Sequence, residues 1–174
     1  KTNENINLNS LKNREHYALW IGHSTFLINN GDLTILTDPI FSERASPLNF
    51  AGPKRLIKPV IKIKDLPEVD VITISHNHYD HLDINSLRKI QKKFPNVKIL
   101  VPKGDLKLLR NYNLNNGFEF LWWEAITLNN TKFIFTPAQH WSARGLRDRN
   151  KSLWGSWFIK NDNKNIFHAG DTGY

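Results

Sequence analysis

The densest group of ionisable side chains lies in SHNHYDHLD, residues 75–83, which holds three of the seven histidines of the chain. In an extended loop His76 and His78 point to the same side, because side chains alternate along an extended backbone. Two imidazoles so placed can ligate one cation, with nitrogen–zinc distances of about 2.0–2.1 Å. Asp80 and His81 add a carboxylate and a third imidazole. Four such ligands exceed what one tetrahedral ion takes from a single loop, so the spacing predicts two ions about 3.5–4 Å apart.

Two further ligands should come from elsewhere in the chain and should also follow strands. His140 comes just after the apolar run KFIFT, and Asp171 comes just after NIFH. Asp171 lies between Gly170 and Gly173, which allow the backbone to turn sharply close to an ion. A carboxylate between two ions can bridge them with its two oxygens. Surface histidines and an ordinary Asp-Gly turn are the alternatives, but HxHxDH after an apolar strand favours a metal site.

The elements that must position these residues are strands interleaved with helices, which indicates an α/β protein. Asp83 is a candidate N-cap for a helix with Ile84, Leu87, Ile90 and Phe94 on one face. A second short helix is expected at 105–112, and residues 42–68 are expected to form a long irregular loop. The expected strands are 16–22, 25–30, 33–39, 69–75, 97–102, 117–124, 131–137, 153–160 and 165–171.

Composition bounds the class of protein. A chain of 174 residues with 40% apolar residues is long enough for one domain, expected at 16–174 after a flexible arm at 1–15. The absence of cysteine excludes disulfides and thiolate metal sites. No apolar run predicts a membrane span or a signal peptide, so we expect a cytoplasmic or peripheral membrane protein. The net charge of +8 favours anionic partners: nucleic acid, acidic lipid surfaces or phosphorylated small molecules.

A longer series of motifs resembles one family. SHNHYDHLD, a later single histidine and GDTGY are similar to the metallo-β-lactamase superfamily of dinuclear zinc hydrolases. WIGHSTFLI, LTDPIFSERASP, GPKR, LWWE, TPAQHWSARG, LWGSWFI and HAGDTGY resemble, in this order, the N-acylphosphatidylethanolamine-hydrolysing phospholipase D family. The resemblance runs from about residue 16 to residue 174. It implies an αββα sandwich, incomplete here, with the first half and the start of the second.

The resemblance also implies a ligand set and a reaction. His76, His78 and His140 would hold the first zinc, Asp80 and His81 the second, and Asp171 would bridge both. A hydroxide held by the two ions, with Asp80 and Asp171 as the catalytic carboxylates, would cleave the phosphodiester into N-acylethanolamine and phosphatidic acid. The family has one more histidine on the second metal, beyond residue 174. The chain alone is therefore expected to lack a ligand and to be inactive.

The expected partner is a phospholipid at a membrane surface, with no nucleic acid and with a homodimer left open. Another hydrolase of the same fold, such as a nuclease or a small-molecule phosphodiesterase, and a non-catalytic metal-binding fragment remain the alternatives. His23, Trp141 and Arg44 are the weaker substrate-binding candidates. For His23 a hydrogen-bonded core position is favoured, and for Arg44 a solvated basic loop. The tryptophans at 122, 123, 141, 154 and 157 are interpreted mainly as core residues.

Overall fold

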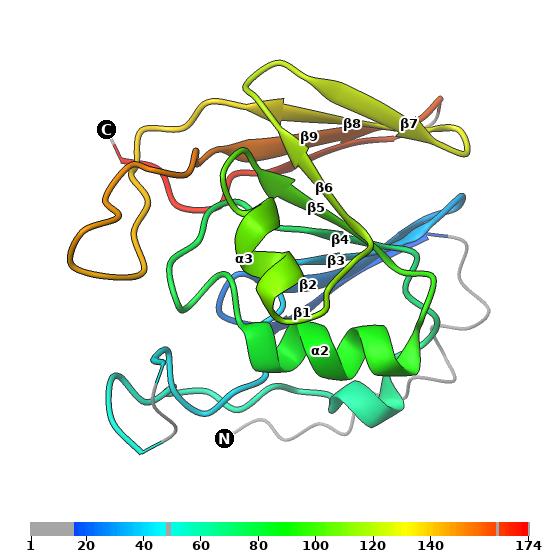
Figure 1. Ribbon diagram of the computed structural model, residues 1–174. Coiled ribbons are helices and arrows are strands. Elements are labelled where there is room, and N and C mark those ends of the chain that lie inside the picture. The colour runs from blue at the N-terminus through cyan, green and yellow to red at the C-terminus, as the bar shows by residue number, and fades with distance from the viewer. Residues whose placement is uncertain (1–15, 48–49, 163, 174) are drawn as a thin grey trace.

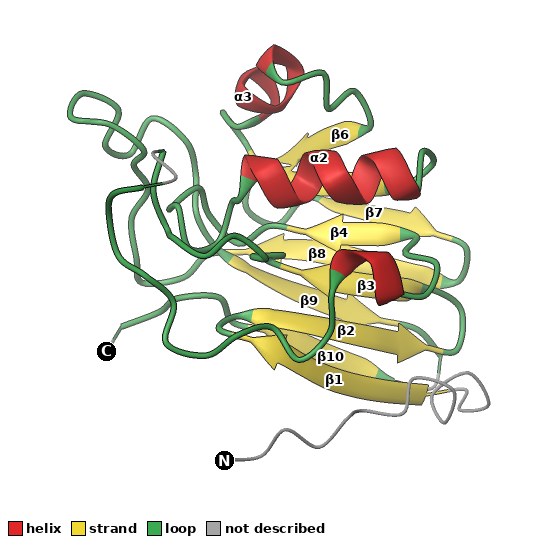
Figure 2. Ribbon diagram, turned by 90° about the horizontal axis from the view of Figure 1, so that it is seen from below, coloured by secondary structure: helices red, strands yellow, loops and turns green. Residues whose placement is uncertain are grey.

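The computed structural model describes residues 16–47, 50–162 and 164–173. The predicted arm at 1–15 lies outside the described residues. Two β-sheets pack face to face, and helices cover the outer side of the larger sheet (Figure 1). Seen from below, α2 (Ile84–Lys93) and the short 3₁₀ helix η1 (Ile63–Asp65) lie over the strands (Figure 2). This is the mixed α/β architecture expected from the sequence.

The larger sheet has the order β1-β2-β3-β4-β5-β6. Its first three strands are antiparallel, and the pairs from β3 to β6 are parallel. The strand bounds are β1 His16–Gly22, β2 Thr25–Asn30, β3 Thr34–Thr37, β4 Val71–Thr73, β5 Lys98–Pro102 and β6 Gly117–Phe120. The carboxyl ends of parallel strands meet at one edge of a sheet, and this edge carries the loop that follows β4.

The smaller sheet has the order β10-β9-β8-β7 and is antiparallel throughout. Its strands are β7 Ala125–Leu128, β8 Thr131–Thr136, β9 Ser156–Lys160 and β10 Asn165–His168. The β7 strand was missed in the sequence. The predicted strand over 117–124 was too long, because β6 ends at Phe120 and Trp123 takes a positive φ of 72° in a turn before β7.

The helices are η1 Ile63–Asp65, α2 Ile84–Lys93 and α3 Leu106–Asn111. The predicted N-cap is confirmed, since the Asp83 side chain accepts a hydrogen bond from the Asn85 backbone N–H. Leu87 and Ile90 of α2 are fully buried and belong to the core between the helices and the larger sheet. No described helix is long and apolar enough to cross a membrane.

A second core fills the space between the sheets. Trp157 of β9 is fully buried there, packed edge-on against Phe120 and tilted against Phe135. The interpretation of the other tryptophans as core was wrong for three of them, because Trp122, Trp123 and Trp141 are exposed. Trp122 and Trp123 lie in the turn between β6 and β7, and Trp141 lies in the loop after β8, so none of them takes the inward position of a strand residue. Trp154 is half-buried.

Candidate metal centre

Three imidazole nitrogens converge at the carboxyl edge of the larger sheet. His76 Nε2 lies 2.9 Å from His78 Nδ1, and His140 Nε2 lies 3.2 Å from each of these atoms. An ion with zinc–nitrogen distances of about 2.0–2.1 Å in tetrahedral geometry separates its ligand atoms by about 3.3 Å. The triangle of nitrogens is thus close to the size that one such ion requires. Burial lowers the pKa of His76 to about 3, so this imidazole is neutral and available as a ligand.

A second group of ligand atoms surrounds His81. Its Nε2 lies 3.2 Å from Asp171 Oδ1 and 3.9 Å from Asp80 Oδ2. This nitrogen is buried and has no hydrogen-bond partner among the described residues. Burial opposes charge on the imidazole, but the carboxylates of Asp171 and Asp38 outweigh it and raise the pKa of His81 to about 10. A cation between the carboxylates of Asp171 and Asp80 would satisfy His81 Nε2 in place of a proton.

Asp171 faces both groups. Its Oδ2 lies 3.8 Å from His140 Nε2, while its Oδ1 faces His81. The two oxygens of one carboxylate are therefore directed to the two sets of imidazoles, which suits a bridging ligand. The contact with His81 outweighs burial and lowers the pKa of Asp171 to about 2. The sequence-based candidates His76, His78, His140, Asp80, His81 and Asp171 are thus all brought together.

Gly170 is what allows Asp171 to reach this position. Its φ is +63°, and an added Cβ would lie 2.5 Å from the Cβ of Ser75. The loops that carry His140 and Asp171 are also joined directly: the Gly173 N–H donates to the carbonyl of Gln139 at 2.8 Å. The smaller sheet thereby delivers two ligands against a loop of the larger sheet.

Asp38 lies beside the candidate ligands, and sequence reasoning missed it. It is completely buried at the end of β3, and its carboxylate accepts hydrogen bonds from the Ser75 N–H at 2.7 Å and the Ser75 hydroxyl at 2.6 Å. It also lies 2.8 Å from His81 Nδ1. A carboxylate bound to one ring nitrogen fixes the tautomer and directs the other nitrogen to a metal. His168, expected only as a strand residue, ends β10 with its Nε2 3.5 Å from Asp38.

His23 occupies a different place from the one expected. The preference for a core position was wrong, because 47% of its side chain is exposed. His23 has a φ of 50° in the sharp turn between β1 and β2. This turn projects the ring toward residues 75–83, which we call the metal loop. Its Nε2 lies 3.1 Å from Asp80 Oδ2, and this hydrogen bond holds the pKa of Asp80 well below its usual range. His23, Asp80 and His81 together form a group that could hold a cation.

The other two weaker candidates lie at different distances from the ligands. The Trp141 ring centroid is 4.3 Å from that of His78, so this exposed side chain borders the metal centre. Arg44 donates from Nη1 to the carbonyl of Gly52 at 2.6 Å, within its own loop. The structure brings Arg44 into no contact with the ligand residues.

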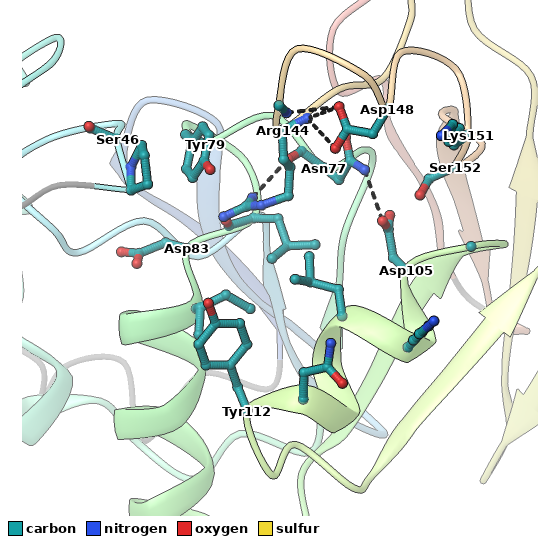
Figure 3. A pocket seen from close by; sticks show the side chains of 18 of the residues that line it. Ser46, Asn77, Tyr79, Asp83, Asp105, Tyr112, Arg144, Asp148, Lys151 and Ser152 are labelled. Carbon is teal, nitrogen blue, oxygen red and sulfur yellow. Dashed lines mark hydrogen bonds between the residues drawn. The ribbon is translucent and has the colours of Figure 1, made fainter.

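Arg144 holds the metal loop by hydrogen bonds to two of its carbonyls. Its Nη1 donates to the carbonyls of Asn77 and Leu82, both at 2.8 Å, so one guanidinium joins two ends of the loop. The guanidinium also lies 4.0 Å from the ring centroid of Tyr79. Figure 3 shows this arrangement beside a polar pocket of about 640 Å³, together with the Asn77 amide donating to Asp105 Oδ1 at 2.9 Å. Arg144 lies within the motif TPAQHWSARG, but sequence reasoning gave it no role of its own.

The comparisons with known proteins agree with this geometry. The family model for the β-lactamase superfamily domain matches residues 34–174. The chain is 38% identical over 167 residues to N-acyl-phosphatidylethanolamine-hydrolyzing phospholipase D 1 of Caenorhabditis elegans, covering 91% of this chain and 47% of that protein. It is 42% identical over 164 residues to the mitochondrial enzyme of the same name from Saccharomyces cerevisiae, covering 91% of this chain and 34% of the relative. The chain thus spans half or less of the length of these relatives.

Solved structures show the same fold. A possible metal-dependent hydrolase from Veillonella parvula superposes with a TM-score of 0.71 at 18% identity, covering 91% of this chain and 63% of that chain. Isothiocyanate hydrolase from Delia radicum gut bacteria superposes with a TM-score of 0.67 at 20% identity, covering 90% and 63%. These likenesses concern the fold, which is that of the metallo-β-lactamases. The family match over most of the described residues shows that the chain belongs to the β-lactamase superfamily.

Proposed function

We propose that this protein is a dinuclear zinc phosphodiesterase that hydrolyses N-acylphosphatidylethanolamine-like phospholipids to N-acylethanolamine and phosphatidic acid. The observation that carries the proposal is the triangle of nitrogens from His76, His78 and His140, which lie 2.9–3.2 Å from one another. Beside it, the Asp171 carboxylate directs one oxygen toward His140 and the other toward His81. The identity to two phospholipases of this specificity supports the choice of substrate.

The residues divide into two sets of ligands. His76, His78 and His140 would hold one zinc, Asp80 and His81 would hold the other, and Asp171 would bridge them. His23 is close enough to the second set to add a nitrogen there. Two zinc ions would lower the pKa of water to about 7 and polarise a phosphoryl oxygen. Asp38, through its contact with His81 Nδ1, would keep the His81 ring in the tautomer that leaves Nε2 free for a metal.

In the proposed reaction, a water oxygen forms a bond to phosphorus and the bond from phosphorus to the ethanolamine oxygen breaks. The released alkoxide takes up the proton that the attacking water loses and leaves as N-acylethanolamine. Asp80 and Asp171 would orient the water; the position of both carboxylates beside His81 supports this role. No side chain of the described residues is needed as a covalent nucleophile. Isotopically labelled water should therefore label the phosphatidic acid, and label in the alcohol would contradict attack at phosphorus.

The direct test is metal removal from the protein in its natural length. Dialysis against a chelator should abolish turnover of N-acylphosphatidylethanolamine, and zinc should restore it. His76→Ala and Asp171→Asn should each reduce kcat/KM by at least about 10²-fold, because each removes a ligand. His16→Ala, at an exposed position in β1, is the matched control and should act as wild type. Full activity in protein shown by elemental analysis to be metal-free would refute the proposal.

A further inference from the structure

Residues 141–152, which follow the candidate ligand His140, carry a group of exposed basic side chains. They are Arg147, Arg149 and Lys151. The one acidic residue of this segment, Asp148, accepts hydrogen bonds from the N–H groups of Arg144 and Gly145 at 3.1 Å and 2.8 Å (Figure 3). Its carboxylate is thus directed toward the backbone, and the segment keeps positive charge at its surface.

Arg149 contacts an aromatic ring that borders the candidate metal centre. Its Cζ lies 4.9 Å from the centroid of the Trp141 ring. The Trp141 ring in turn lies edge-on to the ring of His78, with the two centroids 4.3 Å apart. An aromatic face attracts a cation placed over it, so this contact restricts where the guanidinium lies. Arg149 is therefore held one ring away from a candidate metal ligand.

The donors of Arg149 are free, unlike those of the other arginines beside the site. Arg144 donates to two carbonyls of the metal loop. Arg55 donates to the carbonyls of Ile40 and Ile57. Within the described part of the chain, Arg149 has the ring contact and no hydrogen-bond or carboxylate partner. The N–H groups of this guanidinium thus remain available to a ligand.

A free guanidinium beside the candidate centre favours an anionic ligand. Arginine binds phosphate through two parallel N–H···O hydrogen bonds, a geometry that lysine does not offer. The centre itself would have little net charge, because the carboxylates of Asp38, Asp80 and Asp171 would offset three of the four positive charges of two zinc ions. A further cation beside the ions would therefore contribute to the selection of a negatively charged substrate over a neutral one.

We propose that Arg149, held over the ring of Trp141, is a specificity-determining residue that binds a phosphoryl oxygen of the substrate. This inference rests on the proposed phosphodiester substrate and names the side chain that distinguishes it from an uncharged ester. Binding of a phosphate anion requires no turnover, so it can be tested apart from catalysis.

The test measures the binding of inorganic phosphate to the zinc-loaded protein of natural length by calorimetry. Arg149→Ala should weaken phosphate binding about tenfold or more, because it removes hydrogen bonds between two charged groups. Arg149→Lys should restore only part of the affinity, since an ammonium keeps the charge and loses the paired donors. Arg147→Ala removes the same charge from an exposed position of the same segment, so it is the matched control and should bind phosphate as wild type. In zinc-free protein, Arg149→Ala should leave phosphate affinity unchanged.

Kinetics then distinguish substrate binding from a structural role. With bis(p-nitrophenyl) phosphate, a soluble phosphodiester, Arg149→Ala should raise KM about tenfold, while zinc content and the free energy of unfolding stay at wild-type values. Unaltered phosphate affinity in Arg149→Ala would overturn the inference, as would an equal loss in Arg147→Ala. A loss of the same size in zinc-free protein would place the bound phosphate away from the candidate centre and also overturn it. Phosphate binding that depends on Arg149, without hydrolysis of N-acylphosphatidylethanolamine by wild type, would instead refute the proposed function alone.

Discussion

Asp38 illustrates how one buried carboxylate can control a metal ligand. It has no exposed surface, yet burial does not raise its pKa, because His168, His81 and the Ser75 hydroxyl together keep it low. Its own φ of 35° is unusual for a residue with a side chain, and hydrogen bonds join its carboxylate to Ser75 and His81. The charge retained on Asp38 is what fixes the orientation of the His81 ring.

We predict that Asp38→Asn weakens metal binding without removing any ligand. The amide keeps the shape of the carboxylate but supplies no charge to His81 Nδ1, so the preference for the correct tautomer is lost. Zinc affinity at the second set should fall about 10–100-fold, measured by competition with a chromophoric chelator. Asp65→Asn, at an exposed residue of η1, is the control. Equal affinities in the two variants would mean that Asp38 serves folding alone.

The second prediction concerns Asp105 and the pH dependence of the free energy of unfolding. Burial raises the pKa of Asp105 from 3.8 to about 6. Between these values the folded protein holds a proton that the unfolded chain has released, so stability falls as pH rises from about 4 to about 6 and stays lower above. Asp105→Asn cannot ionise and avoids this loss. In metal-free protein, its free energy of unfolding relative to wild type should improve by up to about 3 kcal/mol between pH 4 and pH 7. A urea-unfolding difference that is the same at both pH values would contradict this.

The sequence revealed the ligands because their spacing carries the chemistry. His76, His78, Asp80 and His81 lie within one loop, and residue type alone marks them. Asp38 and Arg144 act through partners 37 to 67 positions away, and such contacts leave no local pattern. LTDP was assigned to the end of the predicted strand at 33–39, and its aspartate was given no role of its own. His23 was misplaced for a different reason: the backbone of the turn after β1 decides its exposure, and the residue type alone does not reveal this.

At the scale of elements, the metal loop is held in place by Arg144, which lies in the segment after His140. The Arg144 backbone is itself fixed, because the N–H groups of Arg144 and Gly145 donate to the Asp148 carboxylate at 3.1 Å and 2.8 Å. A side chain anchored in this way can hold the carbonyls of Asn77 and Leu82 at fixed positions. The loop is thereby held through hydrogen bonds between protein groups alone.

We expect Arg144→Ala to cost about 3 kcal/mol in the free energy of unfolding, since it leaves two carbonyls without their charged donor. Zinc affinity should fall as well, because the loop must then be ordered by the ion. Arg144→Lys should rescue only part of the loss, as a single ammonium cannot match the planar guanidinium over Tyr79. Arg147→Ala, an exposed neighbour, should leave both quantities unchanged. Unaltered zinc affinity in Arg144→Ala would show that the hydrogen bonds of Arg144 to the metal loop have no effect on metal binding.

The secondary structure was predicted correctly where the periodicity of apolar residues determines it. The prediction failed where contacts with residues remote in sequence determine it. The strands at 16–22 and 25–30 were predicted to the residue, and the cap at Asp83 fixed the start of α2. The failure over 117–124 has a physical reason: the Trp123 N–H bonds to the carbonyl of Phe135, which ends the strand in a turn. That partner is invisible in the local sequence.

The whole molecule is organised around the contact of its two sheets. Trp157 Nε1 donates at 2.8 Å to the carbonyl of Ile74, the residue just before the metal loop. The smaller sheet is thus bonded to the chain at the point where the loop leaves β4. Packing between the sheets and the position of the ligands are coupled through this contact.

Trp157→Phe tests this coupling. The smaller ring loses the indole N–H and leaves a small cavity, so metal-free protein should lose about 2–4 kcal/mol in the free energy of unfolding. Phe167→Leu, at an exposed ring of β10, should change stability by less than about 0.5 kcal/mol. Urea titration of both variants decides the matter. A loss no larger than that of the control would mean that the sheets hold together without Trp157.

Ligands drawn from both sheets have a consequence for the life of the protein in the cell. His140 and Asp171 come from the smaller sheet and the remaining ligands from the larger one. Any ion bound by all of them binds only the folded chain with its sheets in contact, so its binding energy adds to the stability of that contact. The supply of the proposed zinc would then determine how fast the polypeptide is degraded as well as how fast it hydrolyses its substrate. In zinc-starved cells the protein should be degraded faster, and its abundance would report on the availability of the metal.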